Sequence, residues 1–161
     1  MTRPPIANLA HVPLETRGNG QGFVADVGAI GPLIGAQKLG CSLVVVPAGK
    51  KAWPYHLQYA NEEMFVILQG EGTLRHDGER FPVKAGDVIA SPVGKPHQIL
   101  NTSDRELRYL AISTMLEPDI AEYPDSAKRL MLAGSPPGRR PYPLYVIVPN
   151  DATADYWQGE E

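Results

Sequence analysis

The sequence is poor in cysteine, has no block of basic residues and holds no long apolar run. Its single cysteine, Cys41, excludes an internal disulfide framework and favours a reducing compartment. The formal net charge of −3 argues against nucleic acid as a partner. No apolar stretch approaches the roughly 20 residues of a membrane span, and the first residues lack the apolar core of a signal peptide. We therefore expect a cytoplasmic protein that contacts neither nucleic acid nor membrane.

Glycine and proline are abundant, with 16 residues of each in a chain of 161. Between the turns that they favour, Val, Ile, Thr, Tyr and Phe collect in short runs. Many short strands separated by turns are typical of a β-sandwich or a β-barrel. The length is that of one domain with a core of its own. The sequence thus predicts a single all-β domain over residues 1–161.

Strand-like runs can be placed along most of the chain. We expect strands at 23–27, 38–46, 64–70, 72–76, 79–84, 88–91, 97–101, 106–114 and 144–148. Asp77-Gly78, which joins two of these runs, is the strongest short signal for a hairpin. Residues 1–21 predict an irregular arm or one short edge strand, and residues 28–37, with three glycines and a proline, predict a loop. The segment 116–142 predicts one or two helical turns around 126–132 and then a polar linker.

Four residues have side chains that could bind a metal: His56, Gln58 and Glu63, which lie shortly before the apolar strand at 64–70, and His97, which follows a bend about thirty residues later. Side chains two apart in a strand share a face, so His56 and Gln58 point the same way. If the strands of Glu63 and His97 lie beside them, the four side chains converge. Such a set suits a first-row divalent metal. Without Gln58, the remaining two histidines and one carboxylate suit non-haem Fe(II) and oxygen chemistry.

Other polar residues are candidates for roles around such a site. Glu62, Tyr59 and His76 are candidates for a general base. Lys50 and Lys51 lie in a polar loop and could attract an anionic substrate. Within the segment 116–142, the candidates for binding an anionic group of the substrate are Arg129, Arg139 and Arg140. For all of these residues, an ordinary solvated surface position is the competing interpretation.

The spacing of glycines, prolines and ligand residues resembles the two motifs of the cupin superfamily. The second motif is matched completely by Gly86, Pro92, Gly94, His97 and Asn101. The first is matched by Gly49, His56, Glu63 and Gly70, with one extra residue after the first glycine and Gln58 at the place of the second histidine. The resemblance extends over about residues 40–115. It selects Glu63 rather than Glu62 as the ligand, because only Glu63 has the required spacing to the final glycine.

This resemblance implies a double-stranded β-helix, the cupin jelly-roll barrel, with an irregular N-terminal arm and a short C-terminal helical or loop extension. Because many cupins are dimers, it also implies a homodimer. The expected metal ligands are His56, Gln58, Glu63 and His97, and the expected cofactor is a divalent ion, zinc ahead of manganese, iron or nickel. The expected partner is a small-molecule substrate.

The chain resembles single-domain bacterial cupins that are candidate sugar phosphate isomerases. Phosphomannose isomerases, which are zinc-dependent cupins, also use two His, one Glu and one Gln. The resemblance therefore implies a metal-dependent isomerase in which the ion polarises a hydroxy-carbonyl compound and stabilises an enediolate. Two alternatives stay open. One is an Fe(II)-dependent dioxygenase-type cupin, and the other is a small-molecule-binding cupin without turnover.

Overall fold

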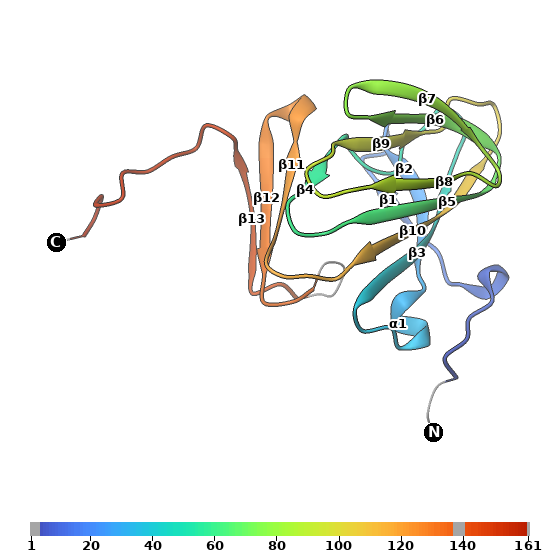
Figure 1. Cartoon of the computed structure of the whole chain (residues 1–161), viewed down its shortest axis with the longest axis horizontal. Helices are drawn as coiled ribbons and strands as arrows, with labels where there is room; N and C mark the ends of the chain where they lie inside the picture. Colours follow the sequence, from blue (N-terminus) through green and yellow to red (C-terminus); the bar gives the residue numbers. More distant parts are fainter. Residues whose placement is uncertain (1–3, 137–140, 161) are drawn as a thin grey trace.

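The computed structural model describes residues 4–136 and 141–160, and most of its regular structure consists of antiparallel strands joined by turns and loops (Figure 1). The largest sheet has six strands in the order β1-β2-β3-β10-β5-β8. Its strands are β1 (Glu15–Gly18), β2 (Val24–Ala29), β3 (Leu39–Val46), β5 (Glu63–Gln69), β8 (Val88–Ser91) and β10 (Leu107–Thr114). The short strand β1 lies at the edge of this sheet, as the sequence predicts for the N-terminal arm.

A three-stranded sheet packs against the six-stranded one. It has the order β7-β6-β9, with β6 (Glu71–His76), β7 (Glu79–Lys84) and β9 (His97–Leu100). The predicted hairpin is confirmed: Asp77 and Gly78 between β6 and β7 have φ of 49° and 87°, the conformation that a two-residue turn requires. The inward side chains of both sheets form one core, including Val44, Phe65 and Ile67 from the large sheet and Leu74 and Ile99 from the small one. The chain is therefore the predicted all-β barrel.

Both faces of β3 are covered, which explains its nearly continuous apolar sequence. Val44 and Val46 point into the barrel core. Leu43 and Val45 belong to a second cluster on the outer face, formed with residues of the N-terminal arm and the segment before β3. That segment contains a single helical turn, α1 (Gly31–Ile34), where a loop was predicted. Pro32 in the first helical turn and Gly35 with φ of 75° at its end favour such a short helix.

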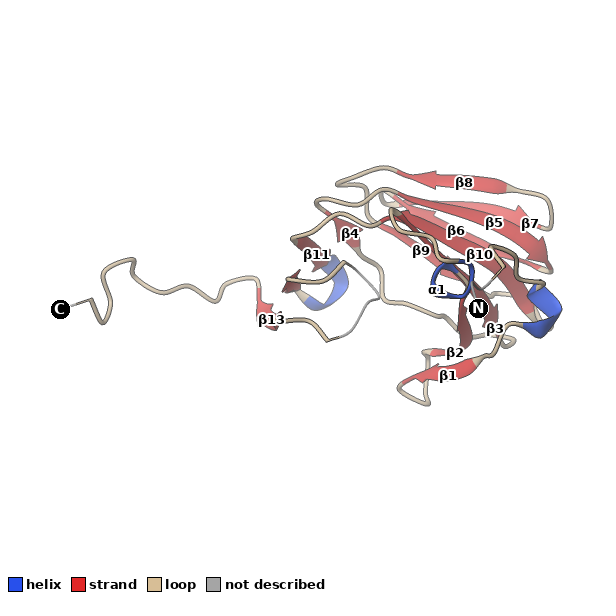
Figure 2. Cartoon of the chain, turned by 90° about the horizontal axis from the view of Figure 1, so that it is seen from below, coloured by secondary structure: helices blue, strands red, loops and turns tan. Residues whose placement is uncertain are grey.

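The C-terminal extension is a third sheet, with the order β13-β12-β11-β4. Its strands are β4 (Leu57–Gln58), β11 (Asp119–Tyr123), β12 (Lys128–Ala133) and β13 (Leu144–Pro149). The helical turns predicted around 126–132 are wrong, because β12 pairs with a strand on each side. Only Pro124–Ser126 forms a helical turn, the 3₁₀ turn η2. Figures 1 and 2 show this sheet beside the barrel and the last residues leading away from it.

The described part of the chain contains three short helical elements: the 3₁₀ turns η1 (Leu9–His11) and η2, and the single turn α1. None of them has the length and apolar character that crossing a membrane as a helix would require.

The side chain of Asn101 connects the end of β3 with the turn that follows β9. This side chain is 2% exposed. The amide nitrogen donates to the carbonyls of Val46 and Arg105 at 2.8 and 2.7 Å, and the amide oxygen accepts from the backbone N–H and the hydroxyl of Ser103. Asn101 thus satisfies backbone groups of this turn with its side chain.

Replacing Asn101 by Ala should lower the free energy of unfolding by about 1–3 kcal/mol, because the carbonyl of Val46 loses a buried amide donor and the N–H of Ser103 loses its acceptor. Urea denaturation followed by circular dichroism measures the change. Asp104→Ala in the same turn is the matched control, since that side chain is 95% exposed and its removal should change stability by less than about 0.5 kcal/mol. Equal stabilities of the two variants would contradict the role given to Asn101.

Candidate metal centre

His56 and His97 lie directly opposite each other in two antiparallel segments. The N–H of His97 donates to the carbonyl of His56 at 2.8 Å, and the N–H of His56 donates back to the carbonyl of His97 at 3.2 Å. Two residues that exchange both hydrogen bonds place their side chains on the same face. The imidazole rings therefore stand side by side, with their centroids 4.7 Å apart.

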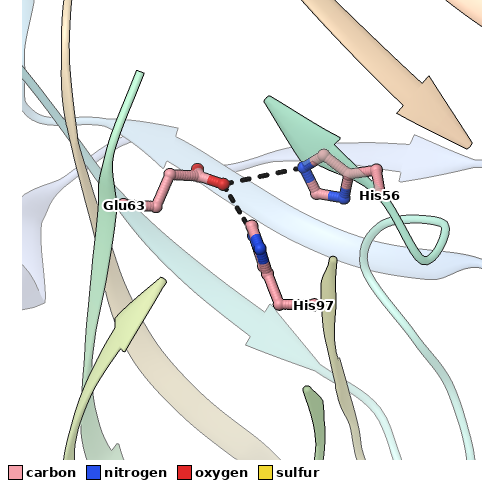
Figure 3. Close-up of side chains that lie close together, drawn as sticks. All are labelled: His56, Glu63 and His97. Carbon is pink, nitrogen blue, oxygen red and sulfur yellow. Dashed lines mark hydrogen bonds and ion pairs between the residues drawn. The ribbon is translucent and has the colours of Figure 1, made fainter. Parts of the chain in front are cut away.

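The third member of the group, Glu63, reaches the two imidazoles from the first position of β5. Its Oε2 atom lies 2.8 Å from Nε2 of His97 and 3.6 Å from Nε2 of His56 (Figure 3). The three candidate ligand atoms all lie within 4.8 Å of one another. Phe65 and Ile67 follow Glu63 on the inward face of β5 and are 3% and 1% exposed. They form an apolar floor beneath the three candidate ligands.

The other nitrogen of each ring is held by a backbone carbonyl. Nδ1 of His56 donates to the carbonyl of Pro54 at 2.9 Å, and Nδ1 of His97 donates to that of Lys95 at 3.0 Å. Because a carbonyl can only accept, the Nδ1 atoms carry the hydrogens, and Nε2 of a neutral ring is then an acceptor. Both Nε2 atoms face Glu63, whose carboxylate also only accepts. Only protons or a cation between these atoms make the arrangement favourable.

Gln58 supplies a further oxygen. Gln58 is the last residue of β4 and lies two positions after His56. Its Oε1 atom is buried and has no hydrogen-bond partner among the described residues. A buried amide oxygen without a partner is costly. Two imidazole nitrogens, a carboxylate and an amide oxygen fit a first-row divalent ion, and the carbonyls on the Nδ1 atoms are the outer contacts that orient metal-binding histidines. These residues form a group that could hold such an ion.

The charges of the group stabilise one another. Burial raises the pKa of Glu63, but hydrogen bonds to His56 and His97 outweigh it and lower this pKa to about 2. Burial lowers the pKa of His56, and the nearby Glu63 carboxylate outweighs it, so the net shift is upward. At neutral pH the site therefore holds a carboxylate next to a histidine that binds a proton more readily than a free one.

The group opens into a cavity of about 300 Å³, called here the metal cavity. Besides the four residues above, the metal cavity is lined by β10 and the C-terminal sheet, with Tyr109, Asp119, Ala121 and Tyr123 among the lining residues. The ring of Tyr123 stacks on that of His56 at 5.9 Å. Asp119 is 4% exposed. The C-terminal sheet is thus one wall of the site.

Sequence reasoning missed Asp119 and Tyr123 because it expected a helix or loop after residue 116. The alternation in DIAEY was the available signal, since Asp119, Ala121 and Tyr123 lie on one face of a strand. Tyr109 was placed with Ala111 and Ser113 on one face of its strand, but the sequence left open which face points inward. The structure shows that this is the inward face.

None of the three candidates for a general base, Glu62, Tyr59 and His76, is among the described residues that line the metal cavity. Glu62 is exposed, and Tyr59 is 52% exposed with its hydroxyl donating to Glu122 at 2.8 Å. That hydrogen bond and partial burial raise the pKa of Tyr59. His76 is paired with His97 across β6 and β9, but it does not line the metal cavity, and its Nε2 atom is buried without a hydrogen-bond partner in the described chain.

The basic residues considered for anion binding also have partners or lie elsewhere. Arg129 forms an ion pair with Glu122 at 3.4 Å. Lys50 donates to the carbonyl of Gln21 at 2.7 Å, and Lys51 lies over the ring of Phe23. The other two candidates, Arg139 and Arg140, lie outside the described residues.

Comparison with known proteins gives one family and several relatives. A family model described as the cupin domain matches residues 42–113. An uncharacterized protein from Methanocaldococcus jannaschii is 41% identical over 69 residues, which are 43% of this chain and 54% of that protein. An oxalate-binding protein from Thermotoga maritima is 38% identical over 61 residues, 38% of this chain and 50% of that protein. The chain thus spans about half the length of the curated relatives it matches.

Solved structures match a larger share of the chain. A candidate sugar phosphate isomerase from Acidithiobacillus ferrooxidans has a TM-score of 0.80 at 25% identity, over 94% of this chain and 97% of that one. A structure from Silicibacter pomeroyi, described as a sugar phosphate isomerase from a cupin superfamily, has a TM-score of 0.78 at 20% identity, over 92% and 95%. Both matches include the C-terminal sheet, because they cover nearly the whole chain.

Replacing Glu63 by Gln should weaken binding of Zn²⁺ or Mn²⁺ by about 100-fold or more, because the site loses its charged ligand. Isothermal titration of metal-free protein measures the affinity, and the unaltered chain should bind one ion. Glu62→Gln is the matched control, since Glu62 is exposed one residue earlier and should leave binding unchanged. Equal affinities of both variants would show that the ion is held elsewhere.

Metal affinity should rise as the pH is raised from 6 to 8. The ion needs a neutral Nε2 on each ring, and the raised pKa of His56 means that a proton competes for this atom over part of that range. Below the pKa of His56, the apparent dissociation constant should change by about tenfold per pH unit. Titrations in buffers of different ionisation enthalpy report the proton released. A constant affinity without proton release would contradict the assignment of His56 as a ligand.

Proposed function

Because the chain belongs to the cupin superfamily, we propose that it is a metal-dependent enzyme that acts on a small hydroxy-carbonyl compound, with sugar phosphates as the first class to test. The observation that carries this proposal is the convergence of two Nε2 acceptors and the Glu63 carboxylate within 4.8 Å of one another, in a cavity that Gln58 with its unpartnered amide oxygen also lines. The likeness to the Acidithiobacillus ferrooxidans protein supports the isomerase reaction in particular.

The ligands proposed for the ion are His56, Gln58, Glu63 and His97, with zinc or manganese as the first ions to test. A divalent ion bound there would act as a Lewis acid toward a carbonyl and a neighbouring hydroxyl. An aldose–ketose interconversion also needs a group that removes a proton from carbon and returns it to the adjacent carbon. This group must come from the walls of the metal cavity.

Asp119 is the residue that we propose as proton acceptor. Its Oδ1 atom accepts hydrogen bonds from the backbone N–H groups of Ala60 and Ile120, at 3.2 and 2.9 Å. These two bonds fix the carboxylate on the wall of the metal cavity, while its second oxygen takes no part in them. Side chains that are locked in this way keep the geometry that proton transfer requires.

Tyr109 is placed to donate a hydrogen bond in the same cavity. It is 1% exposed and lines the metal cavity from β10. Burial raises its pKa, and the charge of Glu63 raises it further, so the hydroxyl stays protonated at neutral pH. A protonated hydroxyl can hold a substrate oxygen on which negative charge develops.

Two alternative functions have observations of their own. The three-residue group His56, Glu63 and His97 is the two-histidine, one-carboxylate set of non-haem Fe(II) enzymes, which supports a dioxygenase. The likeness to the Thermotoga maritima oxalate-binding protein supports binding of a small chelating acid without turnover. Analysis of the metal bound to protein purified without added metal distinguishes the dioxygenase from the isomerase, because iron favours the dioxygenase and zinc favours the isomerase. Oxygen uptake by the iron-loaded protein then tests the dioxygenase directly.

Two further expectations stay predictions, the homodimer and the cytoplasmic location. The outer strand β13 has a free edge, and its residues Leu144, Tyr145 and Ile147 are 46–50% exposed. Exposed edge strands of this kind are commonly covered by another chain.

Replacing Asp119 by Asn should lower kcat for aldose–ketose interconversion by about 10²–10⁴-fold while one ion per chain still binds. A coupled assay over a panel of three- to six-carbon sugar phosphates, with the zinc or manganese form, measures the rates. Glu122→Gln is the matched control, because Glu122 lies on the same strand but faces away from the metal cavity. Absence of turnover by the unaltered, metal-loaded protein on the whole panel would overturn the isomerase proposal.

A further inference from the structure

A second cavity of about 270 Å³ adjoins the metal cavity. We call it the outer cavity. Trp53, Gln58 and Glu63 line both cavities, so the two share a wall that contains one candidate ligand and the unpartnered amide oxygen. The two cavities therefore lie next to each other, with these three side chains between them.

The outer cavity exists because the inward positions of the large sheet carry small residues at one end. Ser42 pairs with Ala29 on one side and Ala111 on the other, and Ser113 lies opposite Gly40 and Glu63. Further along the same strands, the inward positions carry the large residues Val44, Val46, Leu107 and Tyr109, which fill the core. The change from large to small side chains leaves the space next to Glu63 empty of protein.

The outer cavity has one cationic lining residue, Arg17 of β1. Among the described residues, its ion-pair partner is Glu15, two residues away on the same strand, at 3.4 Å, and the two side chains are 50% and 77% exposed. An exposed pair of this kind is weak and exchanges readily for another anion. At the opposite side of the outer cavity lies the Glu63 carboxylate, which an ion at the metal centre would neutralise. The outer cavity is therefore polarised, with its positive end at Arg17.

We propose that the outer cavity binds the anionic end of the substrate, a phosphate or a carboxylate, with Arg17 as the residue that pairs with it. The hydroxy-carbonyl end of the same molecule lies in the metal cavity. The hydroxyls of Ser42 and Ser113, which line the outer cavity between these two ends, are available to the middle of the molecule. This inference rests on the proposed function and adds to it the charge of the substrate and its direction in the site.

Three six-carbon probes test the inference: mannose 6-phosphate, glucuronate and mannose. They carry a phosphate, a carboxylate and no charge. Titration into the manganese-loaded protein should give mannose 6-phosphate, glucuronate or both an affinity at least about tenfold above that of mannose. Whichever anion binds more tightly identifies the phosphate or the carboxylate as the natural group. Equal affinity for all three probes, or binding of none, would overturn the inference.

Arg17→Gln should reduce the preference for the anion to less than about twofold and leave the affinity for mannose unchanged. Arg105→Gln is the matched control, because Arg105 is 89% exposed and does not line the outer cavity. An undiminished preference in Arg17→Gln would overturn the role of Arg17. Ser42→Leu, which fills the outer cavity, is an independent second variant and should abolish binding of the preferred anion; retained binding would contradict the location.

The number of ions bound per chain distinguishes a failure of the outer-cavity inference from a failure of the proposed function. If one Mn²⁺ per chain binds and the probes show no preference for an anion, the outer cavity is not the subsite while the metal centre stands. If no ion binds to the unaltered protein, the proposed function fails and the subsite fails with it.

Discussion

The site depends on one backbone contact, the pair of hydrogen bonds exchanged between His56 and His97. This contact joins the segment before β4 to the start of β9 and forces both imidazoles onto one face. The carbonyls of Pro54 and Lys95 then fix Nδ1–H on each ring and turn Nε2 toward Glu63. Three acceptors directed at one point repel one another unless a positive charge lies between them. The backbone thus builds a site whose charge is completed by a cation.

The sequence predicted this part of the molecule well because the constraints are local. The turn at Asp77-Gly78, the alternation in β5 and β10, and the bend before His97 all depend on residues near in the chain. The two cupin motifs then predicted that Glu63 and His97, which lie far apart in the sequence, belong to one site. The motifs agree with the observed barrel because their glycines and prolines determine where strands end.

The parts that the sequence did not predict depend on pairing between distant segments. Lys128–Ala133 contains good helix formers, yet it is a strand because β11 and β13 satisfy its backbone on both sides. Asp119 reaches the metal cavity only because β11 pairs with β4, more than fifty residues earlier. Arg17 lines the outer cavity for the same kind of reason, since β1 joins the sheet through β2. A local pattern such as the alternation in 119–123 can indicate which side chains share a face of a strand, but it does not indicate which cavity that face borders.

The cupin fold hosts many chemistries, so the reaction must be argued from the residues around the ion. In this chain the barrel strands β5 and β9 supply Glu63 and His97, and β4 with the segment that leads into it supplies His56 and Gln58. The C-terminal sheet supplies Asp119 and Tyr123 on the wall of the metal cavity. The small inward residues at the end of the large sheet leave a second space with Arg17 at its far side. Ligands, proton acceptor and anion partner therefore come from different parts of the fold, and the cavities bring them together.

A crystal structure of the manganese- or zinc-loaded protein, with anomalous diffraction recorded at the absorption edge of the metal, would show where the ion binds. We expect a single anomalous peak about 2.0–2.2 Å from Nε2 of His56, Nε2 of His97 and a carboxylate oxygen of Glu63, with the amide oxygen of Gln58 turned toward it. The absence of a peak there, with His97 still hydrogen-bonded directly to Glu63 in the presence of excess metal, would contradict this expectation.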